Sequence, residues 1–249
     1  MEAFLFGYWG WGSNTELLLD FTAQVEDKRG FAPPCFVDIR VSRSVRAAGF
    51  REQAFEKLAG PDRYLWMPEL GNKRITERAT GIEIVEPRAA GRLLDLIVAR
   101  REKNQRVIFF CACEFPGTSA APQCHRRVVA DLLVGAARSR GVSLVAGEWP
   151  GGQPVEVTVD LSPKDYKKLL GRAATLKTAL PTADAAGLPW GSIVTARCDG
   201  ESYSFVSGPA RVSRGELVLP LCAWGYEDLR EGWREYDGGA GVGWPSAAG

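Results

Sequence analysis

Apolar runs and helical patterns alternate along the first 147 residues, and this alternation limits the fold more than any other feature. Strands that alternate with helices form a parallel sheet with helices on its faces, connected by right-handed crossovers. The sequence therefore predicts a doubly wound α/β domain. We expect its strands at Ala3–Tyr8, Cys35–Ile39, Tyr64–Trp66, 106–112 and Val142–Val145. We expect a first helix that begins at Ser13 and carries an apolar stripe to Val25, and further helices at Phe50–Leu58, 86–103 and 124–140.

Local signals mark several helix ends. Ser13 and Glu16 fit a capping box, in which Ser13 is the N-cap residue. Pro87 suits the first position of the third helix, and Gly141 suits the position just beyond the last one. Residues 73–85 carry a mixed pattern that favours neither a helix nor a strand.

The pattern changes near residue 150, at the Pro- and Gly-rich stretch 149–154. Short strand-like runs separated by Gly-containing turns predict a small β-rich, barrel-like unit. We expect domains at 1–149 and 150–237, and a flexible tail at 238–249. The expected elements of the second unit are strands at Val155–Leu161, Ile193–Cys198, Tyr203–Val206, Ala210–Val212 and Leu217–Leu221, with helices at Ser162–Leu170 and 224–237.

Residues that can support chemistry concentrate around the strand expected at 106–112. His125 is the chain's single histidine, and three of the six cysteines lie within 111–124. A cysteine at a helix N-terminus beside a histidine and an arginine has a lowered pKa, which makes Cys124 a candidate nucleophile. Cys111, at the end of the facing strand, is the rival nucleophile. His125 can act as general acid or base.

Polar residues also follow the other expected strands. Ligands of open α/β sheets bind at the carboxyl ends of the strands, so we expect these residues to meet at one edge. Asp38 and Glu69 are candidate catalytic carboxylates, which orient a group, share protons or activate water. The candidate substrate-binding residues are Tyr8, Gly10, Arg40, Arg43, Glu114 and Arg126, whose arginines suit a phosphate or carboxylate.

Zinc is an alternative occupant of this site. Cys111, Cys113, Cys124 and His125 are ligand types that zinc accepts. However, Cys124 and His125 are adjacent, and neighbours on a helix diverge by about 100°. C-x-C followed by C-H is also not a standard zinc spacing. We therefore predict a site without a cofactor, in which a zinc ion is possible but disfavoured.

Composition narrows the class of protein. The 31 basic and 30 acidic residues nearly cancel, so global charge does not indicate a polyanion-binding protein. A basic stretch at 164–177 keeps nucleic-acid binding as an alternative. No run of about 20 apolar residues and no signal-peptide pattern is present. We expect a cytoplasmic protein with free thiols and no membrane contact.

Five segments of residues 1–147 resemble the bacterial and archaeal family known as domain of unknown function 488. They are Phe6-Gly7-Tyr8, Val37-Asp38-Ile39-Arg40, Pro68-Glu69-Leu70-Gly71, Phe110-Cys111-Ala112-Cys113-Glu114 and Cys124-His125-Arg126. The resemblance implies a doubly wound α/β domain and a catalytic or ligand site at the Cys, His and Arg residues. It implies no particular reaction.

Taken together, these patterns favour an enzyme of the hydrolase or transferase type. Its expected substrate bears a phosphate and is a nucleotide or is derived from nucleic acid. The alternative is a non-catalytic protein that binds nucleotides or nucleic acid, with a role in DNA modification or phage defence.

Overall fold

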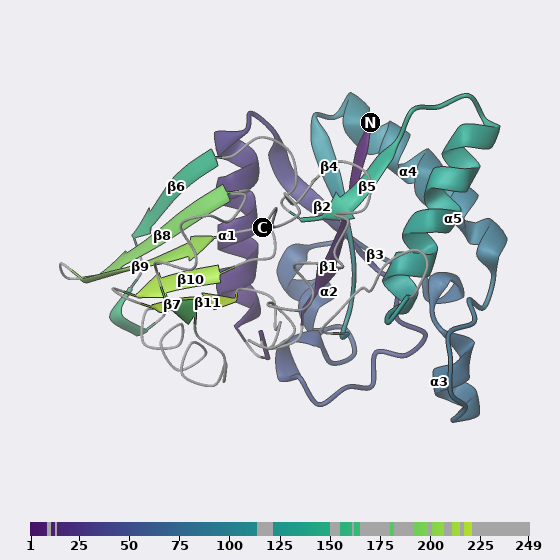
Figure 1. Ribbon diagram of the computed structural model, residues 1–249, viewed down its shortest axis with the longest axis horizontal. Coiled ribbons are helices and arrows are strands. Elements are labelled where there is room, and N and C mark those ends of the chain that lie inside the picture. Colours follow the sequence, from purple (N-terminus) through teal and green to yellow (C-terminus); the bar gives the residue numbers. More distant parts are fainter. Residues whose placement is uncertain are drawn as a thin grey trace, which may run out of the picture.

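Two β-sheets organise the chain in the computed structural model (Figure 1). The structure describes residues 1–8, 11–12, 14–113, 122–149, 155–160, 162–164, 180–181, 192–198, 201–206, 211–214 and 217–220. The first sheet has five strands in the order β3-β2-β4-β1-β5, and every pair in it is parallel. Helices flank it, so the predicted α/β fold with a parallel sheet is confirmed.

The five strands lie close to their predicted positions. They are β1 (Glu2–Gly7), β2 (Ala32–Asp38), β3 (Tyr64–Trp66), β4 (Gln105–Cys111) and β5 (Val145–Glu148). The prediction for β5 was wrong by three residues, because Val142 still belongs to the end of the preceding helix. Its backbone N–H donates to the carbonyl of Ala137, and Gly141 turns the chain with a positive φ of 69°.

The helices depart from prediction at specific ends. They are α1 (Thr15–Lys28), α2 (Ala54–Ala59), α3 (Lys73–Glu77), α4 (Ala90–Glu102) and α5 (His125–Ser139), with short 3₁₀ turns η1 (Ala48–Phe50), η2 (Pro68–Leu70) and η3 (Pro87–Ala89). Asn14, and not Ser13, occupies the N-cap of α1. The helix predicted from Phe50 starts later, because Glu52 adopts a positive φ of 49°. The unpredicted α3 begins after Asn72, whose side chain accepts from the Arg74 N–H.

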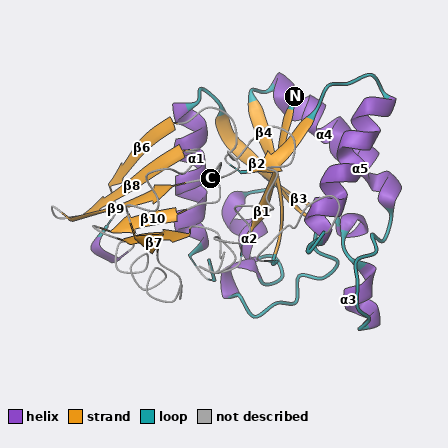
Figure 2. Cartoon of the chain, in the orientation of Figure 1, coloured by secondary structure: helices purple, strands orange, loops and turns teal. Residues whose placement is uncertain are grey.

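Helices cover both faces of the first sheet (Figure 2). On one face, Val37, Phe109 and Cys111 pack into a core with α4 and α5. On the other face, which α1 and α2 cover, the rings of Phe36 and Phe110 pack edge-on against Phe55. Because side chains alternate along a strand, Cys111 points to the α5 side of the sheet. This alternation brings its thiol to the beginning of α5.

The second sheet contains six strands in the order β6-β8-β9-β10-β11-β7. They are β6 (Val155–Asp160), β7 (Leu180–Pro181), β8 (Ser192–Cys198), β9 (Glu201–Val206), β10 (Arg211–Arg214) and β11 (Leu217–Pro220). The β6–β8 pair is parallel and the other pairs are antiparallel. β6 contacts α1 (Figure 1). Barrel closure and the domain boundaries stay predictions, and the segments predicted as a helix at 165–170 and as a helix and tail at 224–249 lie outside the described residues.

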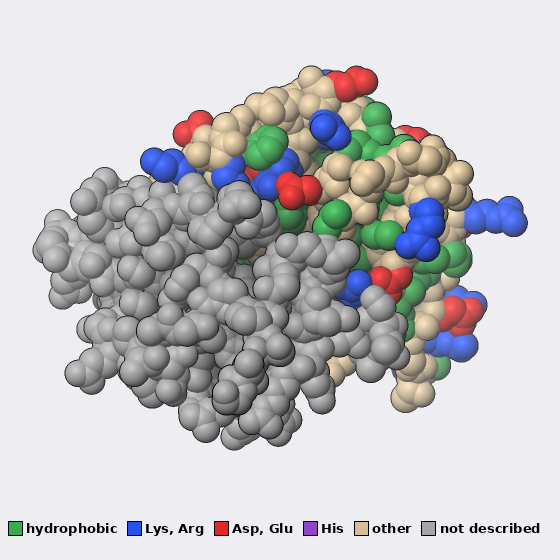
Figure 3. Space-filling model, turned by 45° about the horizontal axis from the view of Figure 1, so that its top comes forward, with side chains coloured by type: hydrophobic (Ala, Val, Ile, Leu, Met, Phe, Trp, Pro, Cys, Tyr) green, Lys and Arg blue, Asp and Glu red, His purple; other side chains and the backbone are tan. Residues whose placement is uncertain are grey.

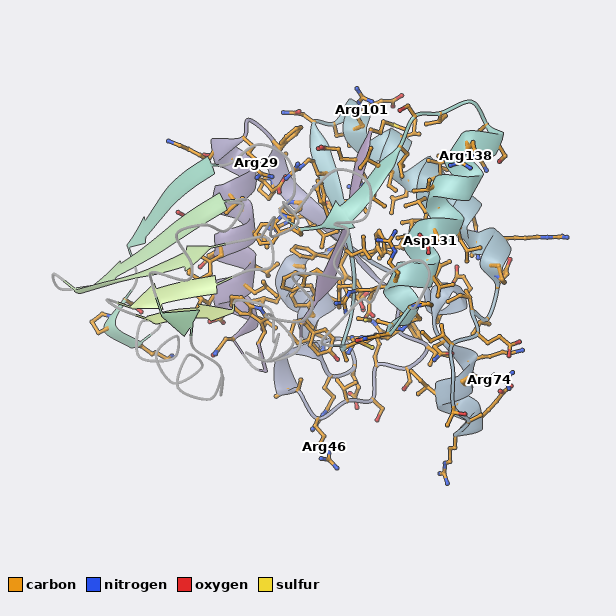
Figure 4. The ribbon with its side chains drawn as sticks, in the orientation of Figure 1. Arg29, Arg46, Arg74, Arg101, Asp131 and Arg138 are labelled. Atoms are coloured by element: carbon orange, nitrogen blue, oxygen red, sulfur yellow. The ribbon has the colours of Figure 1, made fainter. Side chains whose placement is uncertain are left out.

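Charges of both signs are mixed on the described surface, as Figure 3 shows on one face. Arg74, which projects from α3 in Figure 4, pairs with Glu77 and Glu83, and Arg140 of α5 pairs with Asp95 of α4. Within the described part of the chain, no helix has both the length and the apolar character needed to cross a membrane.

Candidate functional site

Three thiols and one imidazole lie together where β4 ends and α5 begins. The sulfurs of Cys111 and Cys124 are 3.1 Å apart, and the Cys124 sulfur is 3.8 Å from Nδ1 of His125. With the sulfur of Cys113, all four donor atoms lie within 4.8 Å of one another. We call these four residues the thiol–imidazole cluster. They could hold a metal ion, and all are buried except Cys113, which is half-buried.

The backbone explains why adjacent residues converge in this cluster. Cys124 is the N-cap of α5, with extended angles of φ −142° and ψ 145°, and its sulfur accepts from the Arg126 N–H at 3.5 Å. His125 is the first helical residue. The expected divergence of about 100° applies only when both neighbours are helical. The geometric objection to a shared ligand was therefore wrong, because the cap residue is extended.

His125 is fixed through its second ring nitrogen. Nε2 lies 3.1 Å from the carbonyl oxygen of Ile39, at the end of β2. A carbonyl can only accept a hydrogen bond, so we assign the ring proton to Nε2. Nδ1 then carries a free lone pair, and it faces Cys124. The end of β2 thus orients the imidazole toward the thiols.

Arg126 brings a buried positive charge to the same place. Its Nη1 donates to the Cys113 carbonyl at 2.6 Å and lies 3.5 Å from the Cys111 sulfur and 3.7 Å from the Cys124 sulfur. Sequence reasoning assigned this guanidinium to an anionic substrate. In the structure it contacts the thiols directly, where it stabilises negative charge on them.

Gly7, at the end of β1, leaves the space that Arg126 and Cys113 fill. A Cβ atom at this position would lie 2.4 Å from the Cys113 carbonyl oxygen and 2.9 Å from Arg126 Nη1. Sequence reasoning did not assign Gly7 a role, although it is the glycine in the Phe6-Gly7-Tyr8 segment. A glycine at the end of a buried apolar strand was the signal in the sequence, because such a glycine often marks a place where another backbone approaches closely.

We predict that Gly7→Ala lowers the free energy of unfolding by about 1–3 kcal/mol, because the new methyl group overlaps the Cys113 backbone. Urea unfolding measures this loss. Gly147→Ala on β5 is the matched control, since its Cβ meets none of the described atoms within 4 Å. Equal stability of the two variants would contradict the close approach at Gly7.

Negative charge in the cluster settles on Cys111 and not on Cys124. Burial raises the pKa of Cys111, but hydrogen bonds from Cys113 and Cys124 and the electrostatic effects of the His125 imidazole and the Arg126 guanidinium outweigh it and leave the pKa below its ordinary value. The pKa of Cys124 is raised, chiefly because its thiol hydrogen-bonds to Cys111. Sequence reasoning expected a lowered pKa at Cys124, because it considered the helix N-terminus without the second thiol.

A buried ion pair lies beside the cluster at the end of β2. Arg40 donates from Nε and Nη2 to the carboxylate of Asp38, at 2.8 and 2.5 Å. The Tyr64 hydroxyl donates to the same carboxylate at 2.8 Å, and Arg40 Nη1 donates to the Tyr8 hydroxyl at 2.9 Å. Asp38, predicted to be catalytic, therefore binds Arg40, and Arg40 also binds Tyr8, although Arg40 and Tyr8 were predicted to bind the substrate. Ile39 lies between the paired residues, so the ion pair also holds the carbonyl that His125 contacts.

Arg43 lies on the far side of this network. Its guanidinium donates to Glu56 at 2.7 Å and stacks over the ring of Trp66 at 4.3 Å. Together with Arg51, Lys57 and one acidic residue, Glu52, it lines an open cavity of about 840 Å³, in which the basic side chains outnumber the acidic one. We call this the basic cavity. Arg43, one of the arginines predicted to bind the substrate, borders open space in this cavity. It lies just beyond the carboxyl end of β2.

The remaining predicted site residues are not part of the described cluster. Glu69, in η2, forms an ion pair with Arg92 of α4 at 2.6 Å. Gly10 and Glu114 lie outside the described residues. The structure thus joins Cys111, Cys124, His125 and Arg126, and it pairs Tyr8, Asp38 and Arg40 next to them. Glu69 is engaged with a neighbouring helix.

Searches against protein-family models, curated proteins and solved structures find no match to this chain. The resemblance to the family of domain of unknown function 488 therefore stays a prediction.

Proposed function

We propose that the protein is a hydrolase or transferase that acts on a phosphate-bearing nucleotide or nucleic-acid-derived substrate. The observation that carries the proposal is the gathering of three thiols, an imidazole and a guanidinium at the carboxyl edge of the parallel sheet. Open α/β sheets place their sites at this edge. Reactive side chains from two segments, the end of β4 and the start of α5, converge here, as is typical of a catalytic site.

The substrate phosphate is assigned to the basic cavity. Arg40 and Arg126, which were the first candidates, hold Asp38 and the thiols instead. Arg43, Arg51 and Lys57 border open space, and guanidinium and ammonium groups there suit phosphate oxygens. Arg43 stacks on Trp66, whose indole N–H donates to the Arg40 carbonyl, so the cavity adjoins the network that orients His125.

The cluster supplies the reactive groups in this proposal. His125 is placed to exchange a proton or to bind an electrophile through Nδ1, and the neighbouring thiols are nucleophiles or ligands. Asp38 keeps a supporting role, because both of its carboxylate oxygens accept from Arg40 or Tyr64. The metal content of the protein, treated below, decides whether the thiols attack a substrate or bind an ion.

Turnover of a panel of nucleotides, phosphomonoesters and oligonucleotides tests the proposal. We expect Cys111→Ser and His125→Ala to reduce the rate on the accepted substrate by at least about 100-fold, because each removes a reactive group. Cys35→Ser is the matched control, since it changes a buried free cysteine outside the cluster and should keep the rate. Full activity of Cys111→Ser, or no turnover of any substrate by the intact protein, would contradict the proposal.

The basic cavity also favours the second candidate, a non-catalytic protein that binds nucleotides or nucleic acid. Cys111→Ser separates the two candidates, and Lys57→Glu tests the cavity that both would use. Arg46→Glu is the matched control for Lys57→Glu, because Arg46 does not line the cavity and its side chain extends into solvent in Figure 4. Binding alone predicts about tenfold weaker, salt-sensitive oligonucleotide affinity in Lys57→Glu and unchanged affinity in Cys111→Ser. An enzyme loses turnover in Cys111→Ser at an unchanged affinity.

A further inference from the structure

The thiol–imidazole cluster brings four potential metal ligands within reach of a single ion. An ion with bonds of about 2.3 Å to sulfur holds two tetrahedral sulfur ligands roughly 3.8 Å apart. The Cys111 and Cys124 sulfurs, 3.1 Å apart, are closer than this value and would have to separate by about 0.7 Å around an ion. The Cys124 sulfur is already 3.8 Å from His125 Nδ1. The Cys113 sulfur completes a set of four donors within 4.8 Å.

The imidazole is prepared for metal binding. A histidine that binds a metal through one nitrogen usually donates its other N–H to a carbonyl or carboxylate. His125 has this arrangement, since Nε2 contacts the Ile39 carbonyl and Nδ1 faces the sulfurs. The supporting carbonyl comes from β2, and the ligands come from the end of β4 and the start of α5.

The donor set selects the class of metal. Three cysteine sulfurs and one imidazole are soft and borderline ligands, which suit zinc and not magnesium or calcium. Three thiolates around a divalent ion leave one negative charge in a buried site. The Arg126 guanidinium, 3.5 Å from the Cys111 sulfur, supplies the compensating positive charge.

We infer that Cys111, Cys113, Cys124 and His125 bind one zinc-class divalent cation, with Arg126 as its outer partner. The ion would tie the end of β4 to the N-terminus of α5. In that role the cysteines are ligands and not free nucleophiles. The inference goes beyond the proposed function, because metal binding is measured without a substrate.

Elemental analysis of the intact protein, purified after growth with zinc, tests the inference. We expect about one zinc ion per chain, and we expect thiol modification to release it to a metal-sensitive dye. Protein reconstituted with Co²⁺ should show the intense d–d bands of a tetrahedral site and sulfur-to-cobalt charge-transfer bands. These measurements use the unmodified chain, so they do not depend on the folding of a variant.

Variants then identify the ligands. Cys113→Ser and Cys124→Ser should lower zinc affinity by at least about tenfold. Cys35→Ser, the same change at a buried thiol outside the cluster, should retain the ion. A folded, metal-free protein, or one in which Cys111 and Cys124 form a disulfide, would overturn the inference. A metal-loaded but inactive protein would contradict the enzyme and support the metal site, whereas an active, metal-free protein would do the reverse.

Discussion

Asp38→Asn is expected to lower the free energy of unfolding by about 3–5 kcal/mol, because it leaves the Arg40 guanidinium buried without its counter-ion. The wild-type carboxylate accepts two guanidinium hydrogen bonds and one from Tyr64. An asparagine side chain cannot accept all of these hydrogen bonds, because it has only one accepting oxygen and its terminal nitrogen is a donor. Urea unfolding, followed by circular dichroism, measures the loss.

Two further variants isolate the charge from the hydrogen bonds. Tyr64→Phe removes one neutral donor to Asp38 and should cost only about 1 kcal/mol. The double change Asp38→Leu with Arg40→Met removes both charges, and it should recover most of the stability that Asp38→Asn loses. A loss below about 1 kcal/mol for Asp38→Asn would show that the ion pair is not buried as described.

Glu26→Gln is expected to have an effect of similar size, about 3–5 kcal/mol, at the opposite end of the sheet. Glu26, on α1, is fully buried and accepts from Nε and Nη2 of Arg106 on β4, at 2.5 and 2.7 Å. The indole N–H of Trp149 donates to the same carboxylate at 2.8 Å. The Arg106 guanidinium also lies over the ring of Phe4, 4.2 Å from its centre. Neutralising Glu26 therefore leaves the Arg106 cation without its buried counter-ion, and the more exposed carboxylate of Glu2 compensates only in part.

Glu2→Gln provides the matched control for this ion pair. Glu2 contacts the same guanidinium, at 3.2 Å from Nη1, but its side chain is largely exposed to solvent. Exposed ion pairs contribute about 0–1 kcal/mol, so the same chemical change should have little effect there. Thermal or urea unfolding of both variants makes the comparison. Equal losses would mean that burial does not set the strength of the Arg106 contacts.

The strands of the first sheet were predictable, because each is a short apolar run with clear ends. Tyr64–Trp66 was predicted residue for residue. The errors came from local backbone geometry that apolar patterns do not report. Glu52 has a positive φ that delays α2, and Val142 closes α5 instead of starting β5. The sequence also predicted strands β6, β8, β9, β10 and β11, but it did not predict β7.

The position of the site was predictable, but the contacts of its residues were not. The carboxyl-edge rule brought Cys111, Cys124, His125 and Arg126 together correctly. It could not show that Asp38 and Arg40 pair with each other, because it places both at the end of the same strand and does not give the direction in which either side chain points. It also could not show that Cys124 is extended, which depends on the cap conformation. Partner choice among nearby polar groups is set by distances that sequence order does not contain.

The strand order β3-β2-β4-β1-β5 has a consequence for how the chain folds during synthesis. β1 and β2 both pair with β4 and not with each other. A nascent chain that has not yet released residues 105–111 therefore holds two apolar strands without their shared partner. The Cys and His residues at 111–125 leave the ribosome just after this strand. Insertion of the central strand β4 and assembly of the cluster thus belong to one late event, which, in the first sheet, only the edge strand β5 follows, and a chain truncated before β4 should aggregate or be degraded.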